Sequence, residues 1–268
     1  MSAPGFIFDR VVMPLSDHLT VLYGRQAWRE SLKIVVVGGN GGIGQAIVQT
    51  IADRYPHASV LATWRRTPPP AIQSNASAEW IQLDASDEDS VEKFARQLKS
   101  LDWLINAAGM LHTPDFGPEK TIRHFDADFF TLNMTANVLP TLLLAKHFGR
   151  CFSDTEKGVF ATVSAKVGSI QDNRLGGWTS YRCSKAALNM ALKNISIEWG
   201  RINSKVCVAA LHPGTTDTDL SKPFQGAVAR DKLFSPQRTA GYLIDVVETL
   251  TPENSGQFLA YDGAVLPW

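Results

Sequence analysis

The chain has 268 residues, 44% of them hydrophobic, which is enough for one large α/β domain with a full core. Its 26 basic and 26 acidic residues give a formal net charge of zero, so no broad basic surface for nucleic acid is expected. No apolar run approaches the ~18 residues of a membrane span, and the first residues lack the pattern of a secretory signal. The three cysteines show no disulfide or zinc spacing, so we expect a cytoplasmic protein with reduced thiols.

The first part of the chain does not follow the pattern of the rest. Residues 1–31 precede the first predicted strand, and they include an apolar piece at 19–23. A short helix is indicated at 26–32. We therefore expect an N-terminal extension at 1–31, followed by a single domain at 32–268.

From residue 33 onward, short apolar runs alternate with segments of helical periodicity. The runs predict strands at 33–37, 59–63, 80–83, 101–105, 159–164, 206–211 and 257–261. The periodic segments predict helices at 43–54, 90–100, 129–148, 180–199 and 236–250. This alternation predicts an α/β fold: a doubly wound parallel sheet of the Rossmann type, with helices on both faces. In such sheets ligands bind at the carboxyl ends of the strands.

A glycine-rich turn directly follows the first predicted strand. Gly38, Gly42 and Gly44 give the spacing GxxxGxG between that strand and the next helix. Glycines here permit a tight turn, close approach of the backbone to a pyrophosphate, and close packing of helix on strand. The helix N-terminus would offer free N–H groups and a favourable dipole to the phosphates. The turn therefore predicts a dinucleotide site.

The second predicted strand ends about 20 residues beyond Gly44 in Thr-Trp-Arg-Arg, at 63–66, and no acidic residue stands there. An acidic residue would bond the ribose 2′-hydroxyl and repel a 2′-phosphate, whereas guanidinium groups match phosphate geometry. Arg65 and Arg66 therefore favour NADP(H), with NAD(H) as the alternative. Asp84 is a candidate acceptor for the adenine amino group, or else a turn or helix cap.

Tyr181 and Lys185 stand four residues apart at the start of a predicted helix. That spacing places a phenol and an ammonium on the same helix face. A phenol with an ordinary pKa of about 10 is a poor proton shuttle at neutral pH, and a nearby ammonium favours the phenolate. Together with the dinucleotide turn, the pair predicts hydride transfer to or from a carbonyl, with the proton delivered by Tyr181.

From about residue 33 to residue 268, the chain resembles the short-chain dehydrogenase/reductase family. The motifs that match in identity and order are the glycine turn, Asn-Ala-Ala-Gly at 106–109, Tyr-x-x-x-Lys at 181–185 and Pro-Gly at 213–214. Within the family, the segments at 38–44, 168–170, 176–178 and 262–268 resemble the branch of C-factor-like proteins and small carbonyl reductases. The resemblance implies an NAD(P)(H)-binding oxidoreductase, and a homodimer or homotetramer built on the two long predicted helices.

The resemblance also implies roles for single residues. Tyr181 would be the general acid/base, and Lys185 would bond the nicotinamide ribose and lower the pKa of Tyr181. Asn137 would hold a water for the proton relay, with Asn133 as a rival one helical turn away. Asn106 would steady the strands behind the cofactor.

We expect the dinucleotide to be bound at the glycine turn, at the strand ends and by the matched motifs, where Thr218 would contact the nicotinamide amide or the phosphates. These residues are Gly38, Asn40, Gly42, Ile43, Gly44, Arg65, Arg66, Asp84, Ala85, Asn106, Ala107, Gly109, Tyr181, Lys185, Pro213, Gly214, Thr216 and Thr218. The expected partner is a small-molecule carbonyl substrate, with no nucleic acid and no membrane.

The serine that polarises the carbonyl in this family is displaced here. It is often the second of a Ser-Ser pair three residues before a glycine, and counting back from Gly168 places Ala165 there and Ser164 one residue earlier. Adjacent residues of a strand point to opposite faces. We expect Ser164 to donate to the carbonyl, with Ser169 as a further candidate and a missing donor as the alternative.

Two classes of function follow. The first is NADP(H)-dependent reduction of an aldehyde, ketone or quinone, with Tyr181, Lys185, Asn137 and Ser164 as the catalytic residues. The second is a dinucleotide-binding signalling or scaffold protein of the C-factor type, with little turnover. Carbonyl-dependent oxidation of NADPH would separate the two.

The remaining aromatic and titratable residues carry weaker signals. Trp178, Phe224 and Phe234 either line the substrate pocket or belong to the core. No metal is expected, because the histidines lack the spacing of metal ligands and are interpreted as surface or packing residues: His112, His124, His147 and His212.

Overall fold

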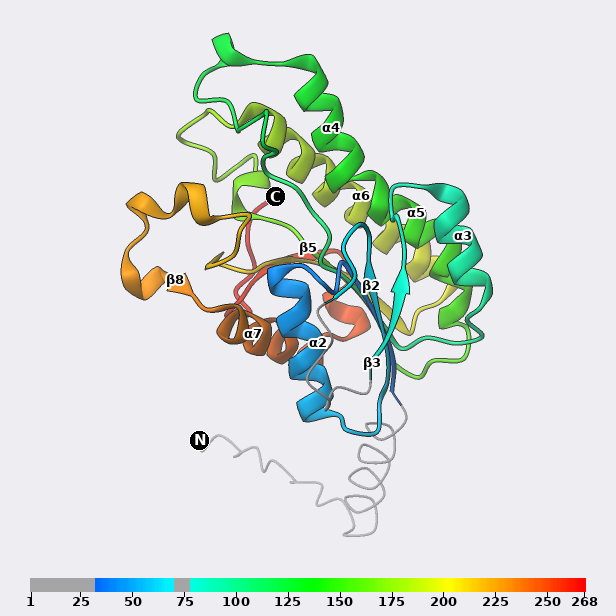
Figure 1. Cartoon of the computed structure of the whole chain (residues 1–268). Helices are drawn as coiled ribbons and strands as arrows, with labels where there is room; N and C mark the ends of the chain where they lie inside the picture. Colours follow the sequence, from blue (N-terminus) through cyan, green and yellow to red (C-terminus); the bar gives the residue numbers. More distant parts are fainter. Residues whose placement is uncertain (1–31, 70–77) are drawn as a thin grey trace, which may run out of the picture.

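The computed structural model describes residues 32–69 and 78–268. The predictions made for residues 1–31, the N-terminal extension and most of its short helix, lie outside the described residues. Within the described part, the chain folds as a single α/β domain with a central parallel sheet (Figure 1).

The sheet has seven strands, and all six neighbouring pairs are parallel. In spatial order they are β3 (Ala78–Gln82), β2 (Ser59–Trp64), β1 (Lys33–Val37), β4 (Trp103–Asn106), β5 (Gly158–Val163), β6 (Val206–His212) and β9 (Gln257–Ala260). All seven predicted strands are confirmed, with bounds shifted by no more than two residues. A separate short pair, β7 (Thr215–Thr216) and β8 (Leu233–Phe234), lies beyond the end of β6.

Helices cover both faces of the sheet, as predicted. They are α2 (Gly42–Arg54), α3 (Glu88–Arg96), α4 (Ala127–Asn137), α5 (Leu139–Phe148), α6 (Thr179–Ile202) and α7 (Pro236–Thr249). Short 3-10 turns occur at Ile122–His124, Gly149–Phe152, Lys166–Gly168, Lys222–Ala227, Arg230–Lys232 and Pro252–Asn254.

The core forms two layers because successive strand residues point to opposite faces. Ile34 and Val36 of β1 pack with α2 and α7, whereas Val35 and Val37 pack with α3, α5 and α6. Figure 1 shows this arrangement, with α2 and α7 on one side of the sheet and the other four helices on the opposite side. Burial on both faces explains why the strands read as continuous apolar runs.

One predicted helix is in fact two. The segment at 129–148 is broken at Val138, so that α4 ends at Asn137 and α5 begins at Leu139. Pro140 has no N–H to donate to the carbonyl of residue 136, and its ring crowds that carbonyl, so the helix cannot continue through it. The break leaves Asn137 at the C-terminal end of α4.

The outer faces of α5 and α6 expose Leu142, Met190 and Ile197. Association of the chain through these helices stays a prediction. Among the described residues, none of the helices is both long and apolar enough to cross a membrane.

Candidate active site

The turn after β1 has the backbone geometry that its glycines predict. Gly38 has φ of +72°, and a Cβ there would lie 2.9 Å from the backbone N of Ala108. A Cβ at Gly44 would lie 2.1 Å from the carbonyl oxygen of Gly38, and one at Gly42 would lie 2.6 Å from Thr218 Cγ2. Side chains would therefore fill the cradle at the N-terminus of α2, which fits the pyrophosphate of a dinucleotide.

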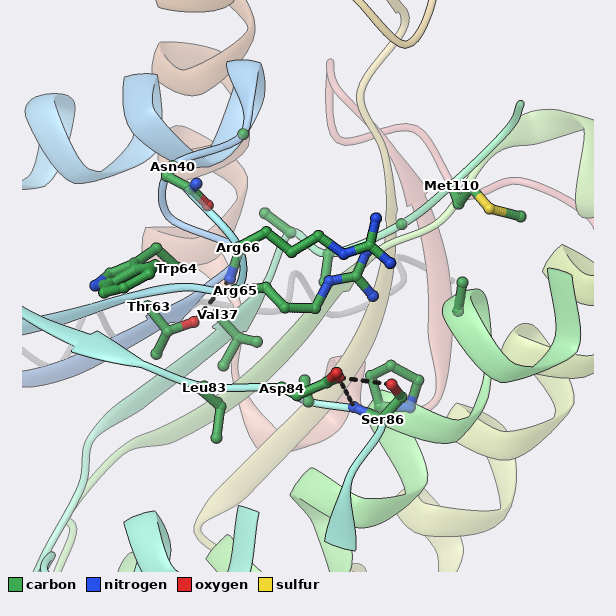
Figure 2. A pocket seen from close by; sticks show the side chains of 18 of the residues that line it. Val37, Asn40, Thr63, Trp64, Arg65, Arg66, Leu83, Asp84, Ser86 and Met110 are labelled. Atoms are coloured by element: carbon green, nitrogen blue, oxygen red, sulfur yellow. Dashed lines mark hydrogen bonds between the residues drawn. The ribbon is translucent and has the colours of Figure 1, made fainter. Parts of the chain in front are cut away.

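A cavity of about 470 Å³ begins at this turn and extends past the ends of β2 and β3. Arg65 and Arg66 follow β2, and Figure 2 shows both guanidinium groups pointing into the cavity. Asp84 and Ala85 line it from the loop after β3, and Asn40 lines it from the turn. The cavity thus brings together residues from separate segments that the sequence predicted to bind the cofactor.

Asp84 forms the turn considered for it and also lines the cavity, while its role as an acceptor for adenine stays a prediction. Its Oδ1 accepts hydrogen bonds from the Ser86 hydroxyl at 2.6 Å and the Ser86 N–H at 3.0 Å, which makes a turn (Figure 2). Burial opposes the charge on Asp84, but these hydrogen bonds and the positive charges of Arg65 and Arg66 outweigh it, so the pKa of Asp84 is lowered. Asp84 therefore lines the cavity as a carboxylate.

A second cavity, of about 330 Å³, lies at the carboxyl ends of β5 and β6. It shares the lining residues Ala107, Ala108 and Gly109 with the first cavity. The shared segment follows β4, at the point where the strand order reverses between β1 and β4. The two cavities together form one elongated site at the topological switch point, where α/β sheets bind their ligands.

Tyr181 and Lys185 line the second cavity from the first turns of α6. Tyr181 is 7% exposed and Lys185 is 3% exposed, and Lys185 Nζ lies 5.7 Å from the centre of the Tyr181 ring. Lys185 Nζ also donates to the carbonyl of Val163 at 3.2 Å. Phenol and ammonium therefore share one buried face of α6, as the spacing predicts.

Burial dominates the electrostatics of this pair. It raises the pKa of Tyr181 above its ordinary value and lowers the pKa of Lys185 to about 8. The expectation that Lys185 lowers the pKa of Tyr181 is thus not met in the free protein, because burial penalises the phenolate and accounts for the shift. The protein holds Tyr181 in the phenol form, which is the form that can donate a proton.

Asn137 is the centre of a buried hydrogen-bond network. Its Oδ1 accepts from the N–H of Met110 at 2.7 Å, and its Nδ2 donates to the carbonyl of Met110 at 2.9 Å. Ser184 Oγ and Asn133 Oδ1 are further acceptors within hydrogen-bond distance of Nδ2, at 3.0 and 3.2 Å, and they share its second proton. A Cβ on Gly109 would lie 3.3 Å from Asn137 Oδ1 and 3.5 Å from Lys185 Nζ, so both groups face the same glycine. Asn133 supports Asn137 rather than replacing it.

The two candidate serines are engaged elsewhere. Ser164 lines the cavity, but it is 2% exposed and its hydroxyl donates to Asn189 Oδ1 at 2.6 Å. Ser169 donates to the carbonyl of Trp268 at 3.2 Å. The hydrogen bond to Asn189 counts against the donor role expected of Ser164, since its single proton is already used. Ala165 also lines the cavity, at the position where the family has its serine.

The other walls of the second cavity are mostly apolar and aromatic. The Trp178 ring lies 6.3 Å from Tyr181 and 5.1 Å from Phe224, and His112 packs against Phe224 at 5.7 Å between ring centres. Trp178 and Phe224 line the cavity. Phe234 instead packs in a cluster with two tyrosines and is 3% exposed, so it belongs to the core.

His212 was interpreted as a surface or packing residue, yet it lines the second cavity directly before Pro213 and Gly214. Its Nδ1 accepts a hydrogen bond from the N–H of Lys166 at 3.3 Å. Burial and the charge of Lys166 lower the pKa of His212 to about 4. The imidazole is therefore neutral at ordinary pH. The position of His212 at the end of a predicted strand was the sequence signal that could have placed it in the site.

The remaining predicted site residues divide into two groups. Ile43, Pro213, Gly214, Thr216 and Thr218 line the second cavity. Gly42, Gly44, Asn106 and Asn137 do not line either cavity. Asn106 donates to Thr141 Oγ1 at 3.0 Å and accepts from the N–H of Ala108 at 3.0 Å, which holds the segment between the two cavities in place.

The profile of the short chain dehydrogenase family matches residues 33–228 of this chain. The 1-hydroxy-2-glutathionyl-2-methyl-3-butene dehydrogenase of Rhodococcus sp. strain AD45 is 30% identical over 239 residues, which cover 88% of this chain and 99% of that protein. The C-signal of Myxococcus xanthus is 38% identical over 108 residues, which cover 40% of this chain and 60% of that protein. The solved structure of an NADPH-bound carbonyl reductase from chicken fatty liver has a TM-score of 0.76 and 28% identity, covering 88% of this chain and 98% of that chain.

The chain therefore belongs to the short-chain dehydrogenase/reductase family, and it is an oxidoreductase. Its relatives include both C-signal and a carbonyl reductase, which confirms the branch that the motifs indicated. The family binds NAD(P), and the glycine cradle with its elongated site fits such a dinucleotide.

We predict that replacing the buried lysine stabilises the free protein. A lysine pKa of about 8 means that the folded state holds the proton less tightly than the unfolded chain does, so at pH 7 the charge lowers the free energy of unfolding. A shift from 10.5 to about 8 corresponds to about 3 kcal/mol, from about 1.4 kcal/mol per pKa unit. Lys185→Met should raise the melting temperature at pH 7, by thermal denaturation without cofactor.

The advantage of the Lys185→Met variant should shrink as the pH rises from about 8 to 10.5, because the wild-type lysine loses its proton in the folded state over that range. Lys193→Met, on an intermediately exposed position of the same helix, is the control. If the Lys185→Met variant melts at a lower temperature than the wild type at pH 7, then the buried charge of Lys185 does not destabilise the free protein.

Proposed function

We propose that this oxidoreductase reduces a carbonyl compound, an aldehyde, ketone or quinone, with NADP(H) as cofactor and Tyr181 as the proton donor. The observation that carries the proposal is the layout of the elongated site. Two guanidinium groups stand at one end, a buried phenol and ammonium stand at the other, and the segment at 107–109 joins them. The NADPH-bound carbonyl reductase of chicken fatty liver, similar in fold and at 28% identity, supports the proposal.

The choice of NADP(H) rests on the end of β2. Arg65 and Arg66 have exposed side chains that line the first cavity, where an acidic residue would select the ribose hydroxyl. Two guanidinium groups can bind a 2′-phosphate by charge-assisted hydrogen bonds. Asp84 lies within the electrostatic reach of both guanidinium groups, whose positive charges help to lower its pKa.

The chain's own residues would handle the proton. When bound, the dinucleotide supplies the hydride for the carbonyl carbon. Tyr181, kept as a phenol by burial, donates its proton to the carbonyl oxygen. Lys185 lies beside the phenol and favours the phenolate that remains. Asn137 Oδ1 and Lys185 Nζ would both contact a Cβ added to Gly109, so Asn137 lies close enough to Lys185 to hold a water that would return a proton to Tyr181.

The second candidate, a dinucleotide-binding protein of the C-factor type with little turnover, is favoured by one observation. Ala165 occupies the position of the family serine, and the hydroxyl of Ser164 is bonded to Asn189. The similarity to C-signal over 108 residues is consistent with this candidate. Tyr181 alone can still polarise and protonate a carbonyl, so we favour the reductase. NADPH oxidation with a panel of small aldehydes, ketones and quinones decides between the two.

We predict that Tyr181→Phe abolishes carbonyl reduction and leaves cofactor binding nearly unchanged. The phenylalanine ring keeps the packing of the tyrosine and lacks only the transferable proton. Steady-state rates and calorimetric titration of NADPH would measure the two effects. Tyr242→Phe, in the aromatic cluster outside the site, is the matched control. Wild-type reduction by Tyr181→Phe would show that the mechanism is wrong.

We predict that Arg65→Ala weakens NADPH binding at least tenfold and changes NADH binding less than threefold. One charge-assisted hydrogen bond to the 2′-phosphate is worth about 1.5–3 kcal/mol, and about 1.4 kcal/mol corresponds to a factor of ten. Calorimetric titration with both cofactors tests this. Arg96→Ala, on the outer surface of α3, should change neither affinity. Equal affinities of the wild type for NADPH and NADH would refute the preference.

We predict that Ala165→Ser raises kcat severalfold, whereas Ser164→Ala lowers it by less than a factor of ten. The first change adds a hydroxyl where the family has its donor, and a donor to the reacting oxygen is worth up to ~10²–10³ in other enzymes. The second change removes a hydroxyl that is already bonded to Asn189. A loss of more than tenfold in both kcat and kcat/KM for Ser164→Ala would restore the role expected from the sequence.

A further inference from the structure

Helix α6, which carries the phenol and the ammonium, has no cap of its own. Its N-cap residue is Trp178, whose side chain makes no capping hydrogen bond, and its first turn has no acidic residue. The first N–H groups of a helix need acceptors, and a negative charge near them is favourable. The acceptors for α6 therefore come from another part of the chain.

Glu119 supplies them from the connection between β4 and α4, 61 residues before Ser180. Its carboxylate oxygens lie 3.1 and 3.3 Å from the backbone N of Ser180 and also accept from the Ser180 hydroxyl. Its main-chain carbonyl accepts from the N–H of Trp178 at 2.5 Å. Glu119 is 4% exposed and Ser180 is fully buried, so these bonds are shielded from water.

The same contacts hold a strained residue. Trp178 has φ of +54°, and it is the one non-glycine residue with positive φ in the described part of the chain. This left-handed conformation is unfavourable for a bulky side chain and persists only where neighbouring structure enforces it. Gly176 and Gly177 before it also have positive φ, and a Cβ on Gly177 would lie 3.0 Å from the carbonyl oxygen of Lys120. The segment around Glu119 therefore fits closely against the start of α6.

The residues that Glu119 contacts include or adjoin two side chains that line the second cavity, Trp178 and Tyr181. Tyr181 directly follows Ser180, so a shift in the first turn of α6 moves the phenol. Trp178 places its ring 6.3 Å from the Tyr181 ring and 5.1 Å from Phe224 at the edge of the second cavity. A displacement of about 1 Å at a reacting group can lower a rate ~100-fold.

We propose that Glu119 is a positioning residue: its carboxylate fixes the first turn of α6 and thereby Tyr181, and its carbonyl holds Trp178 in the left-handed conformation that forms the aromatic wall of the substrate pocket. The proposal rests on the proposed function, because the effect on rate requires Tyr181 to be the proton donor. The effect on structure does not require it.

The rate test compares Glu119→Ala with Glu119→Gln. Glu119→Ala removes the side-chain acceptors, so we expect kcat for carbonyl reduction to fall at least tenfold while the Kd for NADPH changes less than twofold. Glu119→Gln keeps one oxygen that can accept from Ser180, and it should restore kcat to within threefold of the wild type. Ser235→Ala, which removes the side-chain cap of α7, is the control that should lower stability without changing kcat.

The structural test is hydrogen exchange at the N–H of Ser180, which loses its side-chain acceptors in Glu119→Ala. Exchange at Ser180 should be at least tenfold faster in Glu119→Ala than in the wild type, and exchange within α2 should be unchanged. Ser180→Ala is a milder change in the same contact, and it should lower kcat less than Glu119→Ala does. If Glu119→Ala does not fold, Ser180→Ala takes its place in the test.

The two tests separate failure of this inference from failure of the proposed function. If the wild type oxidises no NADPH with any carbonyl, and exchange at Ser180 is still faster in Glu119→Ala, the proposed function is refuted. The role of Glu119 in fixing the first turn of α6 would then still hold. A folded Glu119→Ala variant that keeps kcat within twofold, or shows unchanged exchange at Ser180, would overturn the positioning role.

Discussion

The site depends on the close approach of two backbone turns. Gly38, after β1, and Ala108, after β4, come so near that a Cβ on Gly38 would lie 2.9 Å from the backbone N of Ala108. Only glycine combines the φ of +72° with the absence of a side chain at this point. Parallel pairing joins the ends of β1 and β4 at the switch point of the sheet, and the missing side chain at Gly38 lets the turns that follow them pack directly against each other. It also places the segment at 107–109 between the two cavities, so that one elongated ligand can lie across both.

Burying Tyr181 and Lys185 in the second cavity lowers the stability of the free protein. Tyr181 and Lys185 are buried side by side, and burial shifts the pKa of each toward its neutral form. Hydrogen bonds compensate only in part for the lost hydration of the ammonium. Within the described residues, Lys185 Nζ donates one hydrogen bond, to the carbonyl of Val163. Such a site is costly in the free protein and gains from a ligand that brings charge and hydrogen-bond acceptors. The cost is consistent with a site shaped for function rather than for stability.

Much of the fold could be predicted from the sequence because its signals are local. The apolar runs gave the seven strands, and their alternation with helical segments gave the parallel sheet. Tyr181, Lys185 and the glycine turn were recognisable because their spacing along the chain already sets their geometry. The break at Val138 was missed because the helical periodicity continues through it, although Pro140 was the signal that could have revealed it.

Contacts between distant segments could not be predicted. The hydrogen bond between Ser164 and Asn189 depends on how β5 faces α6, which no spacing encodes. The cap that Glu119 provides joins segments 61 residues apart, and a glutamate in a loop gives no signal of it. Phe234 and Phe224 look alike in the sequence, yet one packs in the core and the other lines the cavity. Tertiary packing decides these cases.

The central claim is that hydride passes within this site from NADPH to a carbonyl carbon. The most direct measurement follows the label from NADPH deuterated at C4 of the nicotinamide, with saturating cofactor and a small aromatic aldehyde. We expect deuterium on the alcohol carbon that carried the carbonyl oxygen in the aldehyde. For the aldehyde, whose carbinol hydrogen does not exchange, an alcohol formed without deuterium from either labelled face of the cofactor would contradict it.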